Sequence, residues 1–508
     1  MYYLAGPSKG TSTKMTDSPV DILYANFIHL DRNSSVPIYL QIANQLILAI
    51  NRGTLKPGSK LLGTRQLANQ LQVHRNTVTA AFEELLAQGW VEIKPNKGTF
   101  VAEELPLNQK ALISSKRYPQ KTGYSFEKTF LFDNPYEISN CQYVWNDGTP
   151  DIRLTQINDL SRVYSANLKR RSNQSKMGYY NQEGSEYFKE QLLSYLKTSR
   201  GLRINLSNLL ITRSMEMSLY ILTEILLKPK DIVVITELNY FSANMTFQKS
   251  GSIIRTVPVD DEGLDTQALR SICEKEKIRM VYLNSHMHYP TVVSLSAKRR
   301  MEIMQLAVEF NFIIVEDDPD YDFQFDKPAL MPLAANDENG MVIYISSFGK
   351  SLAPGFRTGF IVCPENLMQE MYKYLGLIDR QGDVLMEQAL GELIEEGLIH
   401  RHIKKSLKSY RERRDIMASK LISDFKEEIT FEIPNSGLAY WLHWKKPINL
   451  LKLSQIAAKH DLFIPKTLLY QTKDLCAMRV GFGNLTSEEI IESLNILRKS
   501  LNELEKLG

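Results

Sequence analysis

The 508-residue chain has few cysteines and no long apolar run. Its four cysteines (Cys141, Cys273, Cys363 and Cys476) stand far apart with no Cys-x-x-Cys pair, so we expect neither a disulfide framework nor a zinc cluster. No uninterrupted apolar stretch reaches the roughly 18 residues of a membrane-spanning helix. The first residues are polar and lack the apolar core of a signal peptide. The sequence therefore predicts a cytoplasmic protein.

The small net charge of +3 is distributed unevenly along the chain. Residues 1–101 contain 10 Lys and Arg against six Asp and Glu, which leaves the remaining 407 residues at a net charge of −1. The length predicts two or three domains, and a hydrophobic content of 43% is ample for a large core. A small basic module before a near-neutral large one is a weak indication of nucleic-acid binding.

Residues 37–101 have the pattern of three short helices followed by a hairpin. Apolar residues recur at helical spacing over 37–51, and two further helices are predicted over 65–71 and 74–87, with Thr64 as a cap. Helical hairpins are more often structural than DNA-binding. However, Arg75 stands in the first turn of the last helix, where the helix dipole disfavours a cation, and a cation there suits a helix that reads a DNA groove. A hairpin over 90–101 completes a predicted winged helix-turn-helix.

This module resembles the GntR family of bacterial transcription regulators. The matching stretches are PIYLQI, G-x-L-x-P-G (53–58), TRQLA (64–68), VHRNTV (73–78), AFEELLAQGW (81–90) and KGTFV (97–101). The resemblance implies binding to a double-stranded DNA operator through Thr64, Arg65, Arg75, Asn76, Thr77, Lys97, Gly98 and Thr99. His74 replaces the usual N-capping serine, and Gly63 replaces a serine before Arg65, which predicts a different base preference.

The stretch 102–142 has no clean periodicity and contains dispersed prolines, which predicts a linker. About 35 extended residues at ~3.3 Å each span on the order of 100 Å, enough for the DNA module to dock on a partner subunit. We therefore expect a polar tail over 1–35, a winged helix over 36–101, a linker over 102–142 and an effector domain over 143–508.

From residue 146 onward, short apolar runs alternate with helical patterns. The runs are rich in Val and Ile, which predicts a mostly parallel α/β sheet. They span 208–212, 231–236, 280–284, 312–316 and 341–345. Ligands of such sheets bind beyond the carboxyl ends of the strands, so the residues that follow each run are candidate site residues.

Several interpretations are open at these strand ends. Residues 213–216 begin a helix, which could hold a phosphate or could simply be capped. Tyr240 could stack on a flat ligand or belong to the core. His286 and His288 could suggest a metal, but no Cys or carboxylate cluster supports one, so we expect none. The acids at 316–322 could form a solvated turn, bind a metal or place a carboxylate against a ring nitrogen.

The stretch 343–362, IYISSFGKSLAPGFRTGFIV, carries the strongest chemical signal. Lys350 lies on a small-residue loop between two apolar runs, where a charge is costly to bury. It could be a solvated loop lysine, or its amine could be used covalently. Ser347 lies three residues before Lys350 and Arg357 seven after, so a hydroxyl, an amine and a guanidinium could converge on a phosphorylated aldehyde.

The order of these features resembles fold-type I, aminotransferase-like proteins that bind pyridoxal 5′-phosphate. Matching stretches include DGTPD (147–151), residues 177–202, HYPT (288–291), VEDD (315–318), SFGKSLAPGFRTGF (347–360) and MRVGFGNLTSEEI (478–490). The resemblance implies Lys350 as the Schiff-base lysine, Asp317 against the ring nitrogen and Tyr240 as the stacking ring. It implies phosphate binding by Ser214, Met215, Ser347, Arg357 and, from the neighbouring subunit, Tyr179. Arg479 would bind a ligand carboxylate.

This half of the chain also departs from the family pattern. Ser214 and Met215 stand where the phosphate cradle usually has Gly-Ser, and Arg213 precedes them. Residues 319–320, Pro-Asp, occupy the place of an expected tyrosine, and Val292 replaces the glycine after Pro-Thr. These departures bear on efficient transamination rather than on cofactor binding, because Lys350, Asp317 and Arg357 persist.

The fusion of both modules is similar to the MocR/GabR subfamily. That resemblance implies a homodimeric transcription regulator, with the DNA module of one subunit able to reach the other, that senses pyridoxal 5′-phosphate or an amino compound through an aldimine at Lys350. The alternative is an active class I/II aminotransferase with an attached DNA-binding domain. The effector, the operator and the sign of regulation do not follow from the sequence.

Overall fold

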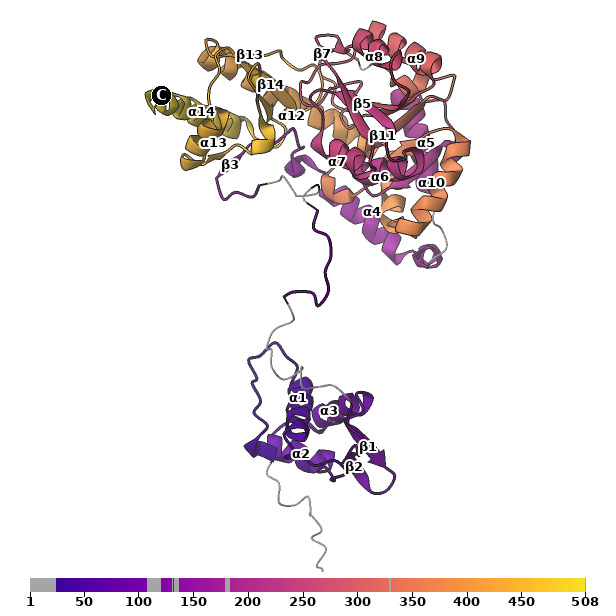
Figure 1. The fold of residues 1–508 in the computed structure, drawn as a ribbon, viewed down its shortest axis with the longest axis vertical. Coiled ribbons are helices and arrows are strands. Elements are labelled where there is room, and N and C mark those ends of the chain that lie inside the picture. The colour runs from indigo at the N-terminus through magenta and orange to yellow at the C-terminus, as the bar shows by residue number, and fades with distance from the viewer. Residues whose placement is uncertain are drawn as a thin grey trace, which may run out of the picture. The chain divides into compact units, whose positions relative to one another are not determined.

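The computed structural model describes residues 24–106, 120–129, 131, 137–178, 183–328 and 330–507. The chain divides into two compact units, Met1–Lys128 and Thr129–Gly508 (Figure 1). Each unit has its own hydrophobic core. Residues 1–23 of the predicted tail and 107–119 of the predicted linker lie outside the described residues.

The first unit is a winged helix-turn-helix, as predicted. Its elements are α1 (Ile38–Asn51), α2 (Thr64–Leu71), α3 (Arg75–Ala87), β1 (Val91–Lys94) and β2 (Gly98–Val101). Strands β1 and β2 pair antiparallel and form the wing. Leu46 of α1 and Val78 and Leu85 of α3 are fully buried in one cluster. The apolar spacing of these helices therefore faces a common core, which leaves the polar start of α3 outside it.

Residues 24–35 also pack on this unit, beginning with the short 3-10 helix Tyr24–Asn26. Tyr24 and Ile28 are 1% and 4% exposed and join the helical core. The side-chain amide of Gln41 accepts from the Asp31 backbone N–H (2.9 Å) and donates to the Asp31 carbonyl (2.9 Å). The predicted boundary at residue 36 therefore separates residues that the structure packs together.

The second unit is built on a seven-stranded sheet in the order β4-β12-β11-β10-β9-β5-β6. Only β12 runs antiparallel to its neighbours β11 and β4. The strands are β4 (Leu209–Thr212), β5 (Ile232–Thr236), β6 (Ile253–Val257), β9 (Ile278–Leu283), β10 (Ile313–Asp317), β11 (Val342–Ser347) and β12 (Gly359–Val362). The predicted, mostly parallel α/β sheet is confirmed.

Helices cover both faces of this sheet. Alternate strand residues point to opposite faces, and since they are apolar on both, each face needs a covering layer. Val233 and Ile235 face one layer and Val234 faces the other. The first layer contains α6 (Met215–Leu226), α7 (Phe241–Lys249) and α10 (Glu365–Ile378). The second contains α4 (Ile157–Lys169), α5 (Glu186–Arg200), α8 (Thr266–Cys273), α9 (Ala297–Phe310) and α11 (Val384–Glu395). A short hairpin, β7 (Val259–Asp260) and β8 (Gly263–Leu264), precedes α8.

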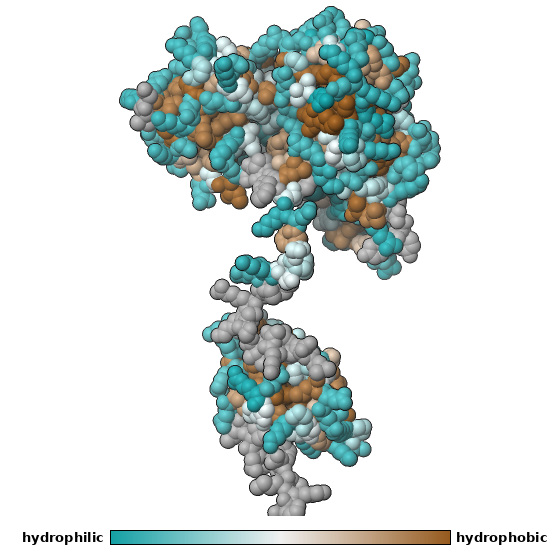
Figure 2. Space-filling view, in the orientation of Figure 1, coloured by the Kyte–Doolittle hydropathy of each residue, from teal (hydrophilic) through white to brown (hydrophobic). Residues whose placement is uncertain are grey.

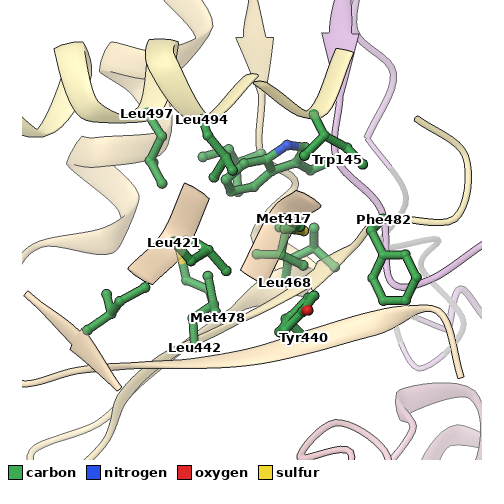
Figure 3. Close-up of a cluster of buried hydrophobic side chains, with 14 of the residues drawn as sticks. Trp145, Met417, Leu421, Tyr440, Leu442, Leu468, Met478, Phe482, Leu494 and Leu497 are labelled. Carbon is green, nitrogen blue, oxygen red and sulfur yellow. The ribbon is translucent and has the colours of Figure 1, made fainter. Parts of the chain in front are cut away.

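The C-terminal part of this unit has a separate core around a four-stranded sheet, β13-β14-β17-β16. Trp145, next to β3 in sequence, packs there with Leu421, Leu442 and Met478 (Figure 3). The elements are β3 (Tyr143–Val144), α12 (Leu398–Phe425), β13 (Ile429–Thr430), β14 (Ala439–Trp444), α13 (Leu450–Lys459), β15 (Leu462–Phe463), β16 (Leu469–Gln471), β17 (Cys476–Gly481) and α14 (Ser487–Leu507). Strand β3 pairs with β15, so the start of this unit is anchored at its C-terminal end.

Hydrophilic side chains cover most of the face of the second unit that Figure 2 shows. In the described part of the chain, no helix combines the length and the apolar character that a bilayer crossing requires.

Candidate functional site

The carboxyl ends of β4, β5, β9, β10 and β11 open into one cavity of about 370 Å³. We refer to it as the strand-end cavity. Its lining includes seven of the predicted cofactor residues: Ser214, Met215, Tyr240, Asp317, Ser347, Lys350 and Arg357. Tyr179 lies outside the described residues. The parallel sheet therefore brings together side chains that are up to 143 positions apart in sequence.

Lys350 follows β11 and lines this cavity rather than an open surface loop. Its side chain is 25% exposed, and its Nζ lies 2.9 Å from Oδ2 of Asp320. A lysine amine in a cavity of this size is within reach of a bound small molecule. The structure therefore places Lys350 at a cavity and in an ion pair, and not on a fully solvated loop.

Asp317 ends β10 and is buried beside the cavity. The Tyr282 hydroxyl donates to its Oδ2, and the Asn284 side chain donates to its backbone carbonyl (2.9 Å). Its Oδ1 is buried without a hydrogen-bond partner in the described structure. Burial raises the pKa of Asp317 to about 7, with Asp318 and Glu216 adding to the effect while Tyr282 and Lys350 oppose it. A protonated ring nitrogen would supply the missing donor and favour the ionised carboxylate.

This raised pKa makes the stability of the cofactor-free chain depend on pH. Between about pH 4 and 7 the folded chain keeps a proton on Asp317 that the unfolded chain has released, so the free energy of unfolding falls as pH rises. We expect Asp317→Asn, which keeps the shape without the charge, to be more stable than the wild type at pH 8 by up to about 4 kcal/mol. Near pH 4 the two chains should unfold alike. Thermal unfolding at both pH values measures this, and an equal difference at both would contradict it.

Helix α6 begins at the edge of the cavity and presents backbone donors to it. The Ser214 side chain caps this helix by accepting from the Met217 N–H (3.2 Å). The Met215 and Glu216 amides lie in the first turn, where backbone N–H groups have no acceptor within the helix. The two interpretations of this segment are therefore compatible: the helix is capped, and its start can also bind an anion.

Ser347 and Arg357 line the same cavity as this helix start and add a hydroxyl and a guanidinium, which are donors suited to a phosphate group. Strand β12 approaches closely here, because a Cβ on Gly359 would lie 2.8 Å from the Thr212 hydroxyl and 2.9 Å from the backbone of Ser214. Arg213, which departs from the family pattern, pairs with Asp379 (2.7 Å). Its guanidinium is therefore partly engaged away from the cavity.

Tyr240 and Tyr289 line the cavity together with Tyr282. Tyr240 stands immediately before α7, and its ring centroid lies 5.2 Å from that of Tyr289 in an edge-on arrangement. Tyr289 was not predicted as a site residue. Its ring lies 4.6 Å from the guanidinium carbon of Arg479.

Arg479, on β17, is fully buried and does not line the cavity. Its Nε donates to the Asp147 carbonyl (2.9 Å) and its Nη1 to the Pro290 carbonyl (2.8 Å). Its Nη2 has no partner among the described residues. The guanidinium therefore keeps one unused donor, with the ring of Tyr289 packed against it.

The histidines and acidic residues that raised the metal alternative have separate partners. His286 pairs with Asp318 (2.9 Å), whereas His288 bonds to the hydroxyls of Thr236 and Thr291. Burial, with Arg479 adding to it, lowers the pKa of His288 to about 3. In the ranges that the structure covers, no three His, Cys, Asp or Glu residues surround a point where a metal ion could sit.

The predicted DNA-binding residues lie at the starts of α2 and α3 and at the wing. Arg65, Arg75, Asn76, Lys97 and Gly98 are exposed, while Thr64, Thr77 and Thr99 are half-buried. The Arg75 guanidinium donates to the Thr64 hydroxyl (3.4 Å), which links the two helix starts. His74 caps α3, because its Nδ1 accepts from the Asn76 N–H (3.3 Å). The unusual histidine therefore performs the capping role of the serine that it replaces.

Sequence reasoning did not predict three residues that line the strand-end cavity, Tyr282, Asn284 and Tyr289, or the contact of Asp320 with Lys350. Tyr282 and Asn284 belong to the third predicted run and its end, so their position was the available signal. Asp320 was noted as one of the acids at 316–322 and as a departure from the family pattern. Its partnership with Lys350 depends on side-chain geometry that no sequence pattern specifies.

Comparison with known proteins agrees with both units. Residues 144–498 match the aminotransferase class I and II family model, and residues 38–101 match that of the bacterial regulatory proteins of the gntR family. The chain is 27% identical over 477 residues to the uncharacterized HTH-type transcriptional regulator YdfD of Bacillus subtilis, covering 92% of this chain and 97% of the relative. It is 23% identical over 483 residues to the probable rhizopine catabolism regulatory protein MocR of Rhizobium meliloti, covering 94% and 97%.

Solved structures agree with the fold of the second unit. Kynurenine aminotransferase from Pyrococcus horikoshii matches with a TM-score of 0.65 and 23% identity, over 72% of this chain and 91% of that one. An archaeal alanine:glyoxylate aminotransferase matches with a TM-score of 0.67 and 22% identity, over 71% and 91%.

Proposed function

The chain belongs to the aminotransferase class I and II family and carries a GntR-type DNA-binding domain before it, and we propose from this that it is a transcription regulator dependent on pyridoxal 5′-phosphate. An amino compound, or the cofactor itself, would be sensed at Lys350. One observation carries the proposal. The chain that forms the winged helix also forms a cavity lined by Lys350 and by Asp317, whose buried Oδ1 has no hydrogen-bond partner among the described residues.

The residues of the strand-end cavity fit the cofactor. The unpartnered Oδ1 of Asp317 suits a protonated ring nitrogen, and Tyr240 offers an aromatic face. The start of α6 with Ser214 and Met215, together with Ser347 and Arg357, suits the phosphate group. The partner subunit's Tyr179 would add a further contact. When bound, pyridoxal 5′-phosphate supplies an aldehyde that reacts with primary amines.

Other residues of the chain would act on the amino compound. Arg479 has one unused donor atom, Nη2, that suits a carboxylate. Lys350 is the group able to accept or release a proton next to the reacting carbon. The binding chemistry is thus shared between a sensor and an enzyme, and proton removal followed by product release distinguishes the enzyme.

The winged-helix unit would bind the DNA operator. We propose that a homodimer presents two winged helices to adjacent half-sites, with Arg75 and Asn76 toward the bases and the wing at Lys97 toward the backbone. Signal transfer requires that the amino compound bind one arrangement of the dimer more tightly than another. The linker around residues 102–142 would carry this difference to the DNA.

Turnover and DNA affinity, measured on the same preparation, separate the regulator from an active aminotransferase. DNA duplexes that bind the chain are first selected from random sequences. We expect the affinity of the chain for these duplexes to change about fivefold or more when pyridoxal 5′-phosphate and an amino-acid pool are added. With a keto acid present, less than one equivalent of amino group should be transferred. Sustained multiple turnover with unchanged DNA affinity would favour the enzyme, the class to which the structural relatives belong.

A further inference from the structure

Lys350 forms a partly buried ion pair with Asp320, three residues beyond the end of β10. Its Nζ lies 2.9 Å from Oδ2 and 3.1 Å from Oδ1 of this carboxylate. The Asp320 side chain is only 5% exposed. In the part of the chain that the structure describes, Lys350 donates the only hydrogen bonds that the Asp320 carboxylate accepts.

The neighbouring acids differ from Asp320 in this respect. Asp318 accepts from Tyr344 and pairs with His286, and Asp322 accepts from Tyr195 and Ser351. Each therefore has partners that do not depend on the state of Lys350. Asp320 alone among these three acids would lose its cation if the lysine amine were engaged elsewhere, and a buried charge without a partner is strongly disfavoured.

This pairing opposes the chemistry that Lys350 would perform. An ammonium ion has no lone pair, so Lys350 must first give a proton to Asp320 or to water. The nitrogen lone pair can then form a bond to an aldehyde carbon, and the aldehyde oxygen leaves as water. The Lys350 amine donates two hydrogen bonds to this carboxylate, and these contacts must break before the nitrogen can reach an aldehyde carbon. A tyrosine, which the family pattern places near this position, is neutral at pH 7 and forms no such ion pair.

We propose that Asp320 is a positioning residue that holds the Lys350 amine in an ion pair, so that this pair opposes covalent capture of an aldehyde by the lysine. The inference rests on the proposed function only for the identity of the aldehyde. For a regulator, such a pair stabilises the cofactor-free state and allows the occupancy of the cavity to follow the cofactor concentration.

Acetylation of the cofactor-free chain tests the ion pair directly. Acetic anhydride reacts with the lone pair of a neutral amine, releases acetate and leaves the lost proton in water. In Asp320→Asn, which keeps the size of the side chain, we expect Lys350 to be acetylated about tenfold faster at neutral pH. The rate is read by peptide mass spectrometry and normalised to exposed Lys298, whose side chain is 72% exposed.

Three further variants isolate the role of the charge. Asp320→Glu retains a carboxylate, so acetylation of Lys350 should remain as slow as in the wild type. Asp320→Ser is a second neutral variant, to be used if the Asp320→Asn chain does not fold. Asp326→Asn removes a half-exposed carboxylate of the same segment that pairs with Arg414, and it should leave Lys350 unchanged. Acetylation of Lys350 in a folded neutral variant within about twofold of the wild-type rate would overturn the proposal.

Pyridoxal 5′-phosphate provides the second readout. Borohydride reduction after brief exposure to the cofactor should trap it on Lys350 about tenfold faster in Asp320→Asn than in the wild type. Faster acetylation without any trapping in either chain would uphold the ion-pair proposal and refute cofactor binding. Trapping in the wild type with equal acetylation rates would refute the ion-pair proposal and uphold cofactor binding.

Discussion

Lys350→Ala is expected to abolish covalent attachment of pyridoxal 5′-phosphate in the strand-end cavity. The wild-type chain, incubated with the cofactor and reduced with borohydride, should carry a pyridoxyl group on the peptide that contains Lys350. The alanine variant has no amine at this position, and Asp320, its only described ion-pair partner, cannot replace it as a nucleophile. Intact-mass measurement and peptide mapping give the stoichiometry, which should fall from about one group per chain to none.

Lys298→Ala is the matched control, because the Lys298 side chain is exposed on α9 and lies outside the cavity. Its removal should leave the stoichiometry at Lys350 unchanged. Cofactor found on several exposed lysines of the wild type but absent from Lys350 would refute the proposed role of this lysine. Retention of DNA binding by Lys350→Ala without cofactor would show that the winged helix acts independently of the cavity.

The sequence predicted the central sheet well for a physical reason. Its interior strands are buried on both faces, so they appear as continuous Val- and Ile-rich runs. Predicted runs such as 231–236 and 341–345 correspond to β5 and β11 within two residues. The edge strand β6 was missed because it is half-exposed and includes Arg255. The four-stranded sheet of the C-terminal part depends on pairing between distant segments, which periodicity does not specify.

The candidate site was predictable to the extent that it depends on strand ends. Lys350, Asp317 and Ser214 each follow or end a recognisable run, and the parallel sheet places such positions at one edge. The position of Arg479 was not predictable in the same way. It lies in the middle of β17, and its burial behind Tyr289 is a long-range contact between segments 190 residues apart. The Asp320 pair is likewise a property of side-chain geometry.

The start of the DNA-binding unit could not be predicted from sequence periodicity. Tyr24 and Ile28 are isolated apolar residues in a polar stretch, so no helical or strand period marks them. Their burial comes from a surface that α1 and α2 create only after folding. A segment that appears to be a tail in sequence therefore contributes to the core of the winged helix.

Arg75→Ala is expected to weaken binding to the selected DNA duplexes by about 10- to 100-fold at fixed salt, because a side chain that reads a base edge contributes about 1–3 kcal/mol. Arg75 is exposed at the start of α3, and its one described hydrogen bond is to the Thr64 hydroxyl (3.4 Å). Its loss should therefore leave the fold of the unit intact. Fluorescence anisotropy on one labelled duplex, with the salt concentration held constant, measures the effect.

Arg75→Lys separates base reading from charge. Lysine keeps the cation but loses the planar fork that binds a base edge at two points. If Arg75 reads a base, the lysine variant should also bind the selected duplex weakly. It should also discriminate less between that duplex and a scrambled one. If lysine restores full affinity and specificity, Arg75 contacts phosphate, and removing it should instead reduce the salt dependence of binding by about one ion. The exposed position of Arg75 beside the capping His74 favours the first outcome, because residues in the first turn of a recognition helix point into the major groove.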